Sequence, residues 1–235
     1  MSVYFYQPGI PDGKHFLEEE EANHCARVLR HKPGDIIQVM DGKGSHYSVQ
    51  LTTATARQCD FSILETRNFP RDPYMVHLAI SPTKNADRTE WMAEKCVELG
   101  IHKLTLLTCD HSERTRVRTD RVLKKMIAAM KQSMRAYAPE LDAEVISMDD
   151  FIDKMQDKIR LCIAYVDMKN PPMHLKDIVM DQDTCILIGP EGDFSNRELE
   201  VARNHKIPSV SLGPYRLRTE TAGVAAVHIL QLLQQ

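Results

Sequence analysis

The stretch Ile186-Leu-Ile-Gly-Pro-Glu-Gly-Asp-Phe-Ser195 indicates the fold class of this 235-residue chain. It opens with a continuous apolar run, which is typical of a parallel strand covered on both faces. A loop with two glycines follows, and then Ser195-Asn-Arg-Glu198, the pattern of a capping box at the start of a helix. Ligands of open α/β sheets bind beyond the carboxyl ends of the strands, so this loop is a candidate ligand site.

A second turn of the same kind runs from Leu212 to Thr221 with the sequence Leu-Gly-Pro-Tyr-Arg-Leu-Arg-Thr-Glu-Thr. It leads from a short strand into an apolar C-terminal helix, which Thr219 or Thr221 could cap. Glycines in one turn can simply satisfy the backbone geometry, but two such turns favour a bound ligand. Arg218 and Glu220 at this rim are candidates for catalysis or substrate orientation, and the alternative is a surface ion pair.

Strand and helix patterns alternate through the chain after residue 73. Apolar strands are expected at 75–80, 104–108, 161–166, 184–188 and 210–212, and helices are expected to begin near 87, 120, 196 and 219. The helix that begins near 120 carries Lys and Arg on one side and is expected to extend to Tyr137, before Pro139. This alternation predicts an α/β domain with a mostly parallel sheet.

The first seventy residues have a different pattern. A helix is expected at 19–30, and strands at 36–40 and 47–51 flank the turn Asp41-Gly-Lys-Gly44, which predicts a hairpin. The segment from Asn68 to Pro73 has the turn residues of a linker. We therefore predict two domains, a small β-rich domain at 1–70 and an α/β domain at 71–235.

Charge is unevenly distributed along the chain. The formal net charge is only −3, but residues 111–135 hold eight Lys or Arg against two acids, a local charge of +6. Residues 138–160 hold three basic residues against seven acids, a local charge of −4. Basic clusters neutralise phosphates, although most are simply solvated faces, so the charge alone leaves RNA binding and a solvated surface open. The candidate RNA-binding residues are Arg27, Arg30, Arg114, Arg116 and Arg118.

Several classes of protein are excluded by missing patterns. The six cysteines are scattered singly, which argues against a zinc site, and we expect no metal. The dinucleotide-binding and P-loop glycine patterns are absent, as are the hydrolase elbow and the zinc-protease helix motif. Neither a secretory signal nor an apolar run of about 20 residues occurs, so a cytoplasmic protein without a membrane anchor is expected.

Four blocks of the sequence together resemble the RsmE family. Gly189-Pro-Glu-Gly-Asp-Phe-Ser195 forms one block, and Leu212-Gly213 with Leu217-Arg-Thr-Glu-Thr-Ala222 forms the second. Upstream residues are similar to the PUA-like N-terminal domain of this family: His24, Arg27-Val-Leu-Arg30, Gly34-Asp35 and Asp41-Gly42. Others are similar to the first half of its catalytic domain: Lys84, Glu94-Lys95, Glu98-Leu-Gly100, Ser112-Glu-Arg114 and Lys131-Gln-Ser133. The resemblance spans nearly the whole chain.

The resemblance implies a SPOUT-type α/β methyltransferase domain with a trefoil knot and a parallel sheet, preceded by a small PUA-like β-barrel domain. It also implies a homodimer and S-adenosylmethionine bound between the two glycine turns, which become two walls of one pocket. The residues implied in cofactor binding are Ile188, Gly189, Glu191, Gly192, Leu212, Gly213, Leu217 and Arg218. Two departures from the family pattern are Asp193, where a glycine is frequent, and Tyr215-Arg216, where Arg-Ile is frequent.

The implied activity is methylation of N3 of a specific uridine in small-subunit (16S) ribosomal RNA. Such an enzyme must align the uracil with the methyl donor and remove its N3 proton. We expect Glu220 to act as the base or as an orienting group, and Arg218 to stabilise negative charge on the uracil carbonyls. The alternatives are methylation of another RNA position, such as a ribose 2′-OH or a tRNA base, and a non-catalytic RNA-binding protein.

Overall fold

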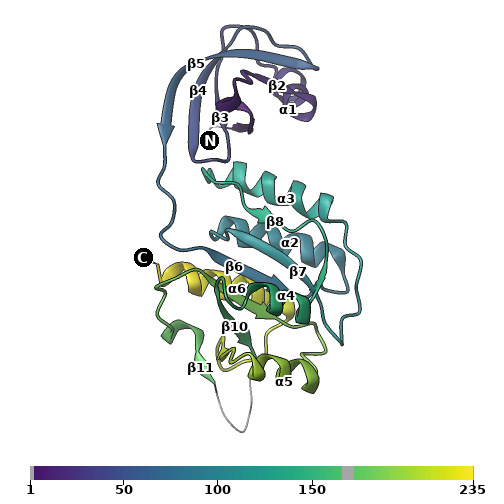
Figure 1. The fold of residues 1–235 in the computed structure, drawn as a ribbon. Helices are drawn as coiled ribbons and strands as arrows, with labels where there is room; N and C mark the ends of the chain where they lie inside the picture. Colours follow the sequence, from purple (N-terminus) through teal and green to yellow (C-terminus); the bar gives the residue numbers. More distant parts are fainter. Residues whose placement is uncertain (1–2, 166–171, 235) are drawn as a thin grey trace. The chain divides into compact units, whose positions relative to one another are not determined.

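The computed structural model describes residues 3–165 and 172–234, and these form two compact units (Figure 1). The first unit comprises residues up to Arg71 together with Met130–Ala138. The second comprises Asp72–Ala129 and the chain from Pro139 onward. The division into two domains at 1–70 and 71–235 stays a prediction. It did not anticipate that Met130–Ala138 groups with the first unit.

The first unit is built on a five-stranded sheet with the order β1-β3-β4-β5-β2. Its strands are β1 (Tyr4–Tyr6), β2 (Phe16–Glu18), β3 (Ile36–Met40), β4 (Ser45–Leu51) and β5 (Gln58–Asn68). β3 and β4 pair antiparallel, as the hairpin prediction requires. One short 3-10 turn, η1 (Ile10–Asp12), precedes β2, and the helical segment comprises α1 (Glu19–Asn23) and η2 (His24–Val28). The buried side chains Phe5, Leu17, Ala22, Val49 and Phe61 contribute to one core, which joins the helical segment to the sheet.

Residues 130–138 complete this first unit. Lys131 forms an ion pair with Glu21, and the Tyr137 hydroxyl donates to the Phe69 carbonyl at 2.9 Å. The Ala138 amide donates to the Gly42 carbonyl at 2.8 Å. The predicted helix to Tyr137 is therefore too long. Its apolar spacing continues, but α3 (Thr119–Gln132) ends where Met134 adopts φ of 56°.

The second unit contains a parallel sheet with the order β11-β13-β10-β12-β6-β7-β8, and β9 also pairs with β7. Its strands are β6 (Val76–Ile80), β7 (Lys103–Thr108), β8 (Glu140–Leu141), β9 (Ile146–Ser147), β10 (Arg160–Ala164), β11 (Met173–His174), β12 (Thr184–Ile188) and β13 (Ser209–Ser211). Every residue of β12 is buried, as its continuous apolar run predicted. The strand expected at 161–166 ends at Ala164, and Val166 lies outside the described residues.

Helices cover both faces of this sheet. On one face lie α4 (Met148–Met155) and α5 (Asn196–Asn204), whose side chains share a core with Cys185 and Leu187 of β12. On the other, α6 (Thr219–Leu232) packs on β6 and against α2 (Ala86–Glu98). Gly223 permits this close approach, because a Cβ there would lie 2.9 Å from Ile80 Cδ1. A short turn, η3 (Leu175–Asp177), also contacts α6.

The α/β class with a parallel sheet and a small N-terminal β domain is confirmed, and the trefoil knot stays a prediction. None of the helices in the described part of the chain is long and apolar enough to cross a membrane.

Candidate functional site

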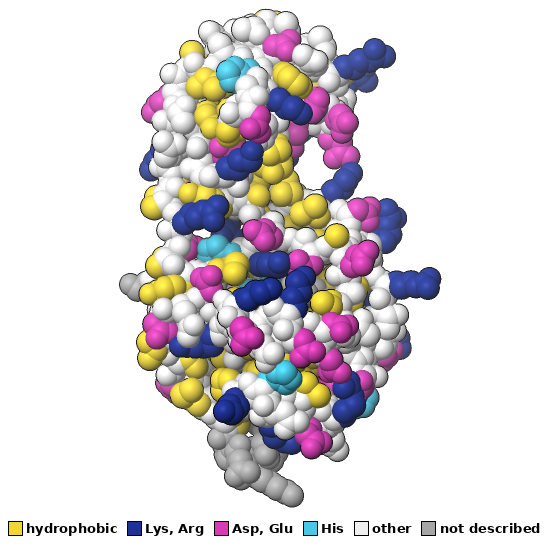
Figure 2. Space-filling model, in the orientation of Figure 1, with side chains coloured by type: hydrophobic (Ala, Val, Ile, Leu, Met, Phe, Trp, Pro, Cys, Tyr) yellow, Lys and Arg dark blue, Asp and Glu magenta, His cyan; other side chains and the backbone are white. Residues whose placement is uncertain are grey.

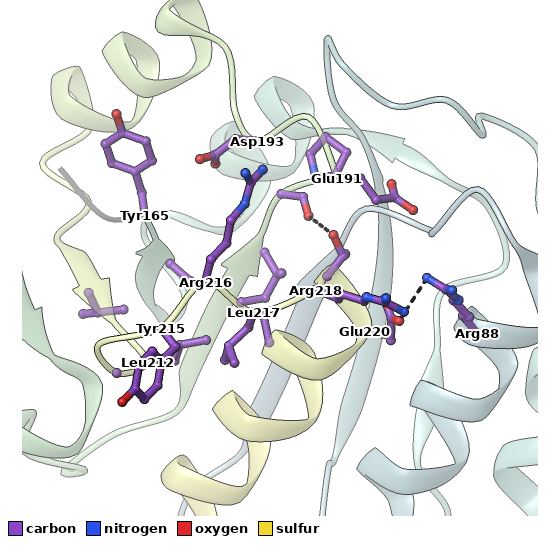
Figure 3. Close-up of a pocket in the computed structure, with 18 of the residues that line it drawn as sticks. Arg88, Tyr165, Glu191, Asp193, Leu212, Tyr215, Arg216, Leu217, Arg218 and Glu220 are labelled. Atoms are coloured by element: carbon purple, nitrogen blue, oxygen red, sulfur yellow. Dashed lines mark hydrogen bonds and ion pairs between the residues drawn. The ribbon is translucent and has the colours of Figure 1, made fainter. Parts of the chain in front are cut away.

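A pocket of about 660 Å³ lies at the carboxyl ends of β10, β12 and β13, beside the start of α6 (Figure 3). Its walls come mainly from the two loops that the sequence singled out. The residues that line it are Arg88, Ala164, Tyr165, Ile188, Gly189, Pro190, Glu191, Asp193, Val210, Leu212, Gly213, Pro214, Tyr215, Arg216, Leu217, Arg218, Thr219, Glu220 and Ala222.

The loop after β12 is held in a tight conformation. A Cβ at Gly189 would lie 3.1 Å from the Phe194 ring, so a larger residue there would crowd the loop. Asp193 adopts a left-handed conformation with φ of 64°, and its Oδ1 accepts a hydrogen bond from the Phe194 amide at 2.8 Å. Aspartate tolerates this conformation better than most residues. Asp193 can therefore occupy the position where a glycine is frequent in the family without disrupting the turn.

The same loop is anchored to the loop after β7. Ser195 and Glu198 form the predicted capping box at the start of α5. The Ser195 hydroxyl also donates to Asp110 at 2.6 Å. Two hydrogen bonds from Arg197 to Asp110, at 3.0 and 2.8 Å, complete the link. The Arg197 guanidinium and the Ser195 hydroxyl lower the pKa of Asp110 to about 2, so this anchor is charged at neutral pH.

The loop after β13 is joined directly to the first loop. Thr219 is the first residue of α6, and its hydroxyl donates to the Gly189 carbonyl at 3.2 Å. The predicted cap by Thr219 or Thr221 is wrong, because Arg218 occupies the cap position. Gly213 has φ of 138°, and no described atom lies within 4 Å of where its Cβ would be. The chain at Gly213 therefore presents bare backbone to open space at the pocket.

Glu220 is the buried charged residue of the pocket. Its side chain is 9% exposed, and its Oε1 lies 3.4 Å from Arg88 Nη1 (Figure 3). Its Oε2 has no hydrogen-bond partner among the described residues. Sequence reasoning missed Arg88, because it lies on α2, far along the chain from both glycine turns.

Most of the predicted cofactor-binding residues come together in this pocket. Ile188, Gly189, Glu191, Leu212, Gly213, Leu217 and Arg218 line it. Gly192 does not line it and packs against His111, where a Cβ would lie 3.0 Å from the His111 Cβ. Arg216 points toward Asp193, whereas Tyr215 points away from Asp193 and is 82% exposed (Figure 3).

The five predicted RNA-binding arginines differ in their surroundings. Arg27 and Arg30 are exposed in the first unit, and Arg116 is exposed in the second. Arg114 donates two hydrogen bonds to the Lys84 carbonyl, at 3.0 and 2.8 Å, and Arg118 pairs with Asp120 at 3.0 Å. Acidic and basic side chains are mixed on the face shown in Figure 2.

The lining of the pocket suits a ligand with an apolar ring and groups of both charges. Ile188, Val210, Leu212, Leu217 and Ala222 provide apolar surface. The carboxylates of Glu191, Asp193 and Glu220 provide negative charge, and the guanidinium groups of Arg88, Arg216 and Arg218 provide positive charge. The volume lies within the roughly 300–1,000 Å³ usual for small-molecule sites. S-adenosylmethionine, with its adenine, its sulfonium and its carboxylate, has this chemistry. Among the residues described, no group of three or more His, Cys, Asp or Glu is arranged to hold a metal ion.

Comparisons with known proteins assign the chain. Residues 70–231 match the family described as RNA methyltransferase domain, and residues 17–64 match the RNA methyltransferase PUA domain. Ribosomal RNA small subunit methyltransferase E from Aquifex aeolicus is 32% identical over 91% of this chain and 92% of its own length. The chain belongs to the RsmE family of RNA methyltransferases.

Solved structures agree with the RsmE assignment. A probable rRNA-methyltransferase from Porphyromonas gingivalis is 38% identical, with a TM-score of 0.89 over 99% of this chain and 98% of that one. The Neisseria gonorrhoeae ribosomal RNA small subunit methyltransferase E, bound to S-adenosyl methionine, is 26% identical, with a TM-score of 0.87 over 99% and 98%. The predicted family and the predicted RNA methyltransferase activity are confirmed for this RsmE protein.

Proposed function

We propose that this RsmE protein transfers the methyl group of S-adenosylmethionine to N3 of a specific uridine in small-subunit (16S) ribosomal RNA. The observation that carries this proposal is the pocket in which two glycine turns meet beside the buried Glu220. The names of the relatives support the ribosomal substrate, and the S-adenosyl methionine bound to the N. gonorrhoeae relative supports the donor.

The cofactor is held mainly by main chain. Ile188, Gly189 and Glu191 from one turn, and Leu212 and Gly213 from the other, line the pocket. Gly213 leaves room for a ligand close to the backbone. Leu217 and Arg218 close the wall toward α6. When bound, the sulfonium supplies an electrophilic methyl group. Gly192 packs against His111, so it acts by shaping the loop.

Glu220 and Arg218 act on the uracil. Glu220 accepts the N3 proton, and N3 then bonds to the methyl carbon while the carbon–sulfur electron pair returns to sulfur. The proton passes from Glu220 to water, so charge and atoms balance. Arg218, which is exposed at the rim of the pocket, stabilises the negative charge that develops on the uracil carbonyls.

Recognition of the RNA requires more than the pocket. N3 is normally occupied in base pairing, so the uridine must be unpaired or extruded before it reacts. The PUA-like unit with Arg27 and Arg30, and Arg114, Arg116 and Arg118 of the second unit, contact the phosphates. We include in the proposal the homodimer that the family resemblance implies, and a reaction that needs no metal.

Mass mapping of 16S rRNA tests this function. A strain that lacks the gene should lose one methyl group on one uridine, and its small subunits should regain it when incubated with the purified protein and S-adenosylmethionine. A lost ribose methyl group or a lost tRNA methyl group would contradict the uridine-N3 assignment. Calorimetry that detects no S-adenosylmethionine binding would favour the non-catalytic alternative, and sedimentation tests the dimer.

A further inference from the structure

A second cavity adjoins the cofactor pocket. Its volume is about 810 Å³, and it is more open than the first. The two cavities share Arg88, Arg216, Leu217, Arg218 and Glu220 as walls. Molecules bound in the two cavities would therefore be neighbours along the Arg218 and Glu220 side chains, and transfer between two substrates requires such proximity.

Trp91 lines the second cavity but not the first, as do Asp87 and Thr221. It is 46% exposed, and it lies three residues after Arg88 on α2, so both side chains lie on the same side of the helix. An exposed indole in a cavity that is also lined by arginines can serve as a platform on which a nucleobase stacks.

Glu220 has one carboxylate oxygen whose hydrogen-bonding capacity is unsatisfied. Arg88 engages its Oε1, whereas its buried Oε2 has no hydrogen-bond partner among the described residues. A buried acceptor without a partner is unfavourable, and a ligand with an N–H group would satisfy it. Uracil carries such a group at N3, but neutral cytosine carries none there, so this oxygen discriminates between the two pyrimidines.

We propose that the second cavity is the acceptor-nucleotide site, in which Trp91 stacks on the uracil, Glu220 Oε2 accepts the N3–H, and Arg88 positions the Glu220 carboxylate. This assignment rests on the proposed function and adds to it the residues that hold and select the base. Trp91 and Glu220 touch the base, whereas Arg88 is a positioning residue that acts through Glu220.

Fluorescence provides a direct test, because Trp91 is the only tryptophan of the chain. The full-length protein, saturated with S-adenosylhomocysteine, is titrated with uridine monophosphate and with a small-subunit rRNA fragment that contains the target uridine. Stacking should quench Trp91 emission. Uridine monophosphate should bind more tightly than cytidine monophosphate, and more tightly than N3-methyluridine monophosphate. Emission unchanged by both the nucleotide and the RNA would overturn the assignment.

Kinetics with small subunits from the deletion strain complete the test. Trp91→Ala should lower kcat/KM about tenfold to a hundredfold, Trp91→Phe should restore most of it, and affinity for S-adenosylmethionine should stay unchanged. The control Val179→Ala alters a side chain that is 69% exposed and lines neither cavity, and it should match wild type. Equal activity of Trp91→Ala and wild type would also overturn the assignment.

Arg88 requires its own measurement, since its loss could act through stability alone. Arg88→Met should lower kcat more than it raises KM for RNA, and Arg88→Lys should recover part of the rate. An Arg88→Met variant with wild-type kcat would refute the positioning role. If wild type methylates small subunits while Trp91 is insensitive to RNA, the cavity assignment fails and the proposed function stands. If wild type methylates no small subunits, the proposed function itself fails.

Discussion

The hydroxyl of Thr219 donates to the carbonyl of Gly189 at 3.2 Å, and this bond ties the first residue of α6 to the loop after β12. It joins the two walls of the proposed cofactor pocket, which are separated by α5 and β13 in the sequence. Thr219 is buried, so water cannot easily replace the lost partner.

Removal of this hydroxyl should loosen the pocket. Thr219→Val should lower the affinity for S-adenosylmethionine about threefold to tenfold, because a buried carbonyl then loses its donor at a cost of about 1 kcal/mol. Thr219→Ser keeps the donor and should bind nearly as wild type does. Titration calorimetry measures both. Equal affinities of the Val and Ser variants would show that the bond is unimportant for the pocket.

Substitution of the two proposed catalytic residues should separate chemistry from cofactor binding. Glu220→Gln removes the base but keeps the shape, and it should lower kcat about a hundredfold to ten-thousandfold. Arg218→Ala should lower kcat as well, since it removes charge stabilisation. Single-turnover methylation of small subunits at saturating S-adenosylmethionine measures the rates, so that a weaker hold on the cofactor in Arg218→Ala does not enter them; calorimetry of the cofactor is the control for Glu220→Gln. Wild-type rates in both variants would refute these roles.

Arginines of the first unit should affect RNA binding alone. The double variant Arg27→Ala/Arg30→Ala should weaken binding to small-subunit RNA and reduce the slope of log affinity against log salt by about 2. Its affinity for S-adenosylmethionine should remain at the wild-type level. Arg57→Ala, which alters another exposed arginine of the same unit, is the matched control. An effect of the control as large as that of the double variant would argue against a specific surface.

His77 gives the protein a predictable response to acid. Its Nε2 lies 2.8 Å from the Thr105 hydroxyl, which itself donates to Asp142, so Nε2 carries the proton. Nδ1 is buried and has no hydrogen-bond partner in the described part of the chain. Burial, with the positive charge of Lys103, lowers the pKa of His77 to about 4.

The direction of the pH effect follows from this lowered value. In the unfolded chain, histidine has a pKa of about 6.5, so at pH values between about 4 and 6.5 the unfolded state binds a proton that the folded state does not. The free energy of unfolding should therefore fall by up to about 3 kcal/mol as the pH drops through this window. Urea denaturation of wild type and of His77→Gln measures the free energy of unfolding at each pH. The variant should lack the decrease that protonation of His77 causes. Parallel pH profiles of the two proteins would contradict the prediction.

Local sequence patterns predicted five of the eight described strands of the second unit, and they missed the two-residue strands β8, β9 and β11. The strand at 184–188 was predicted because its apolar run reflects burial on both faces, a property of the segment itself. The capping box at Ser195 is also local, since all its partners lie within four residues. The two glycine turns could be found in the same way, because their glycines mark places where a side chain would not fit or would be strained.

Features that depend on distant partners were missed. Arg88 has no local signal, because its role comes from Glu220 on another helix. The end of α3 was misplaced, because its apolar spacing continues through residues that pack in the first unit instead of along a helix. Thr219 has the residue type of a cap, but a hydrogen bond to the other loop engages its hydroxyl.

The return of Met130–Ala138 to the first unit has a consequence for biosynthesis. During translation, the five strands of that unit leave the ribosome early. The segment that forms the ion pair with Glu21 and the hydrogen bonds to the carbonyls of Gly42 and Phe69 emerges only after α3 has been translated. The N-terminal unit therefore cannot mature as a finished module during translation of its first seventy residues. A fragment that stops at Arg71 should lack these contacts, and a fragment that carries residues 130–138 behind a short linker should regain them.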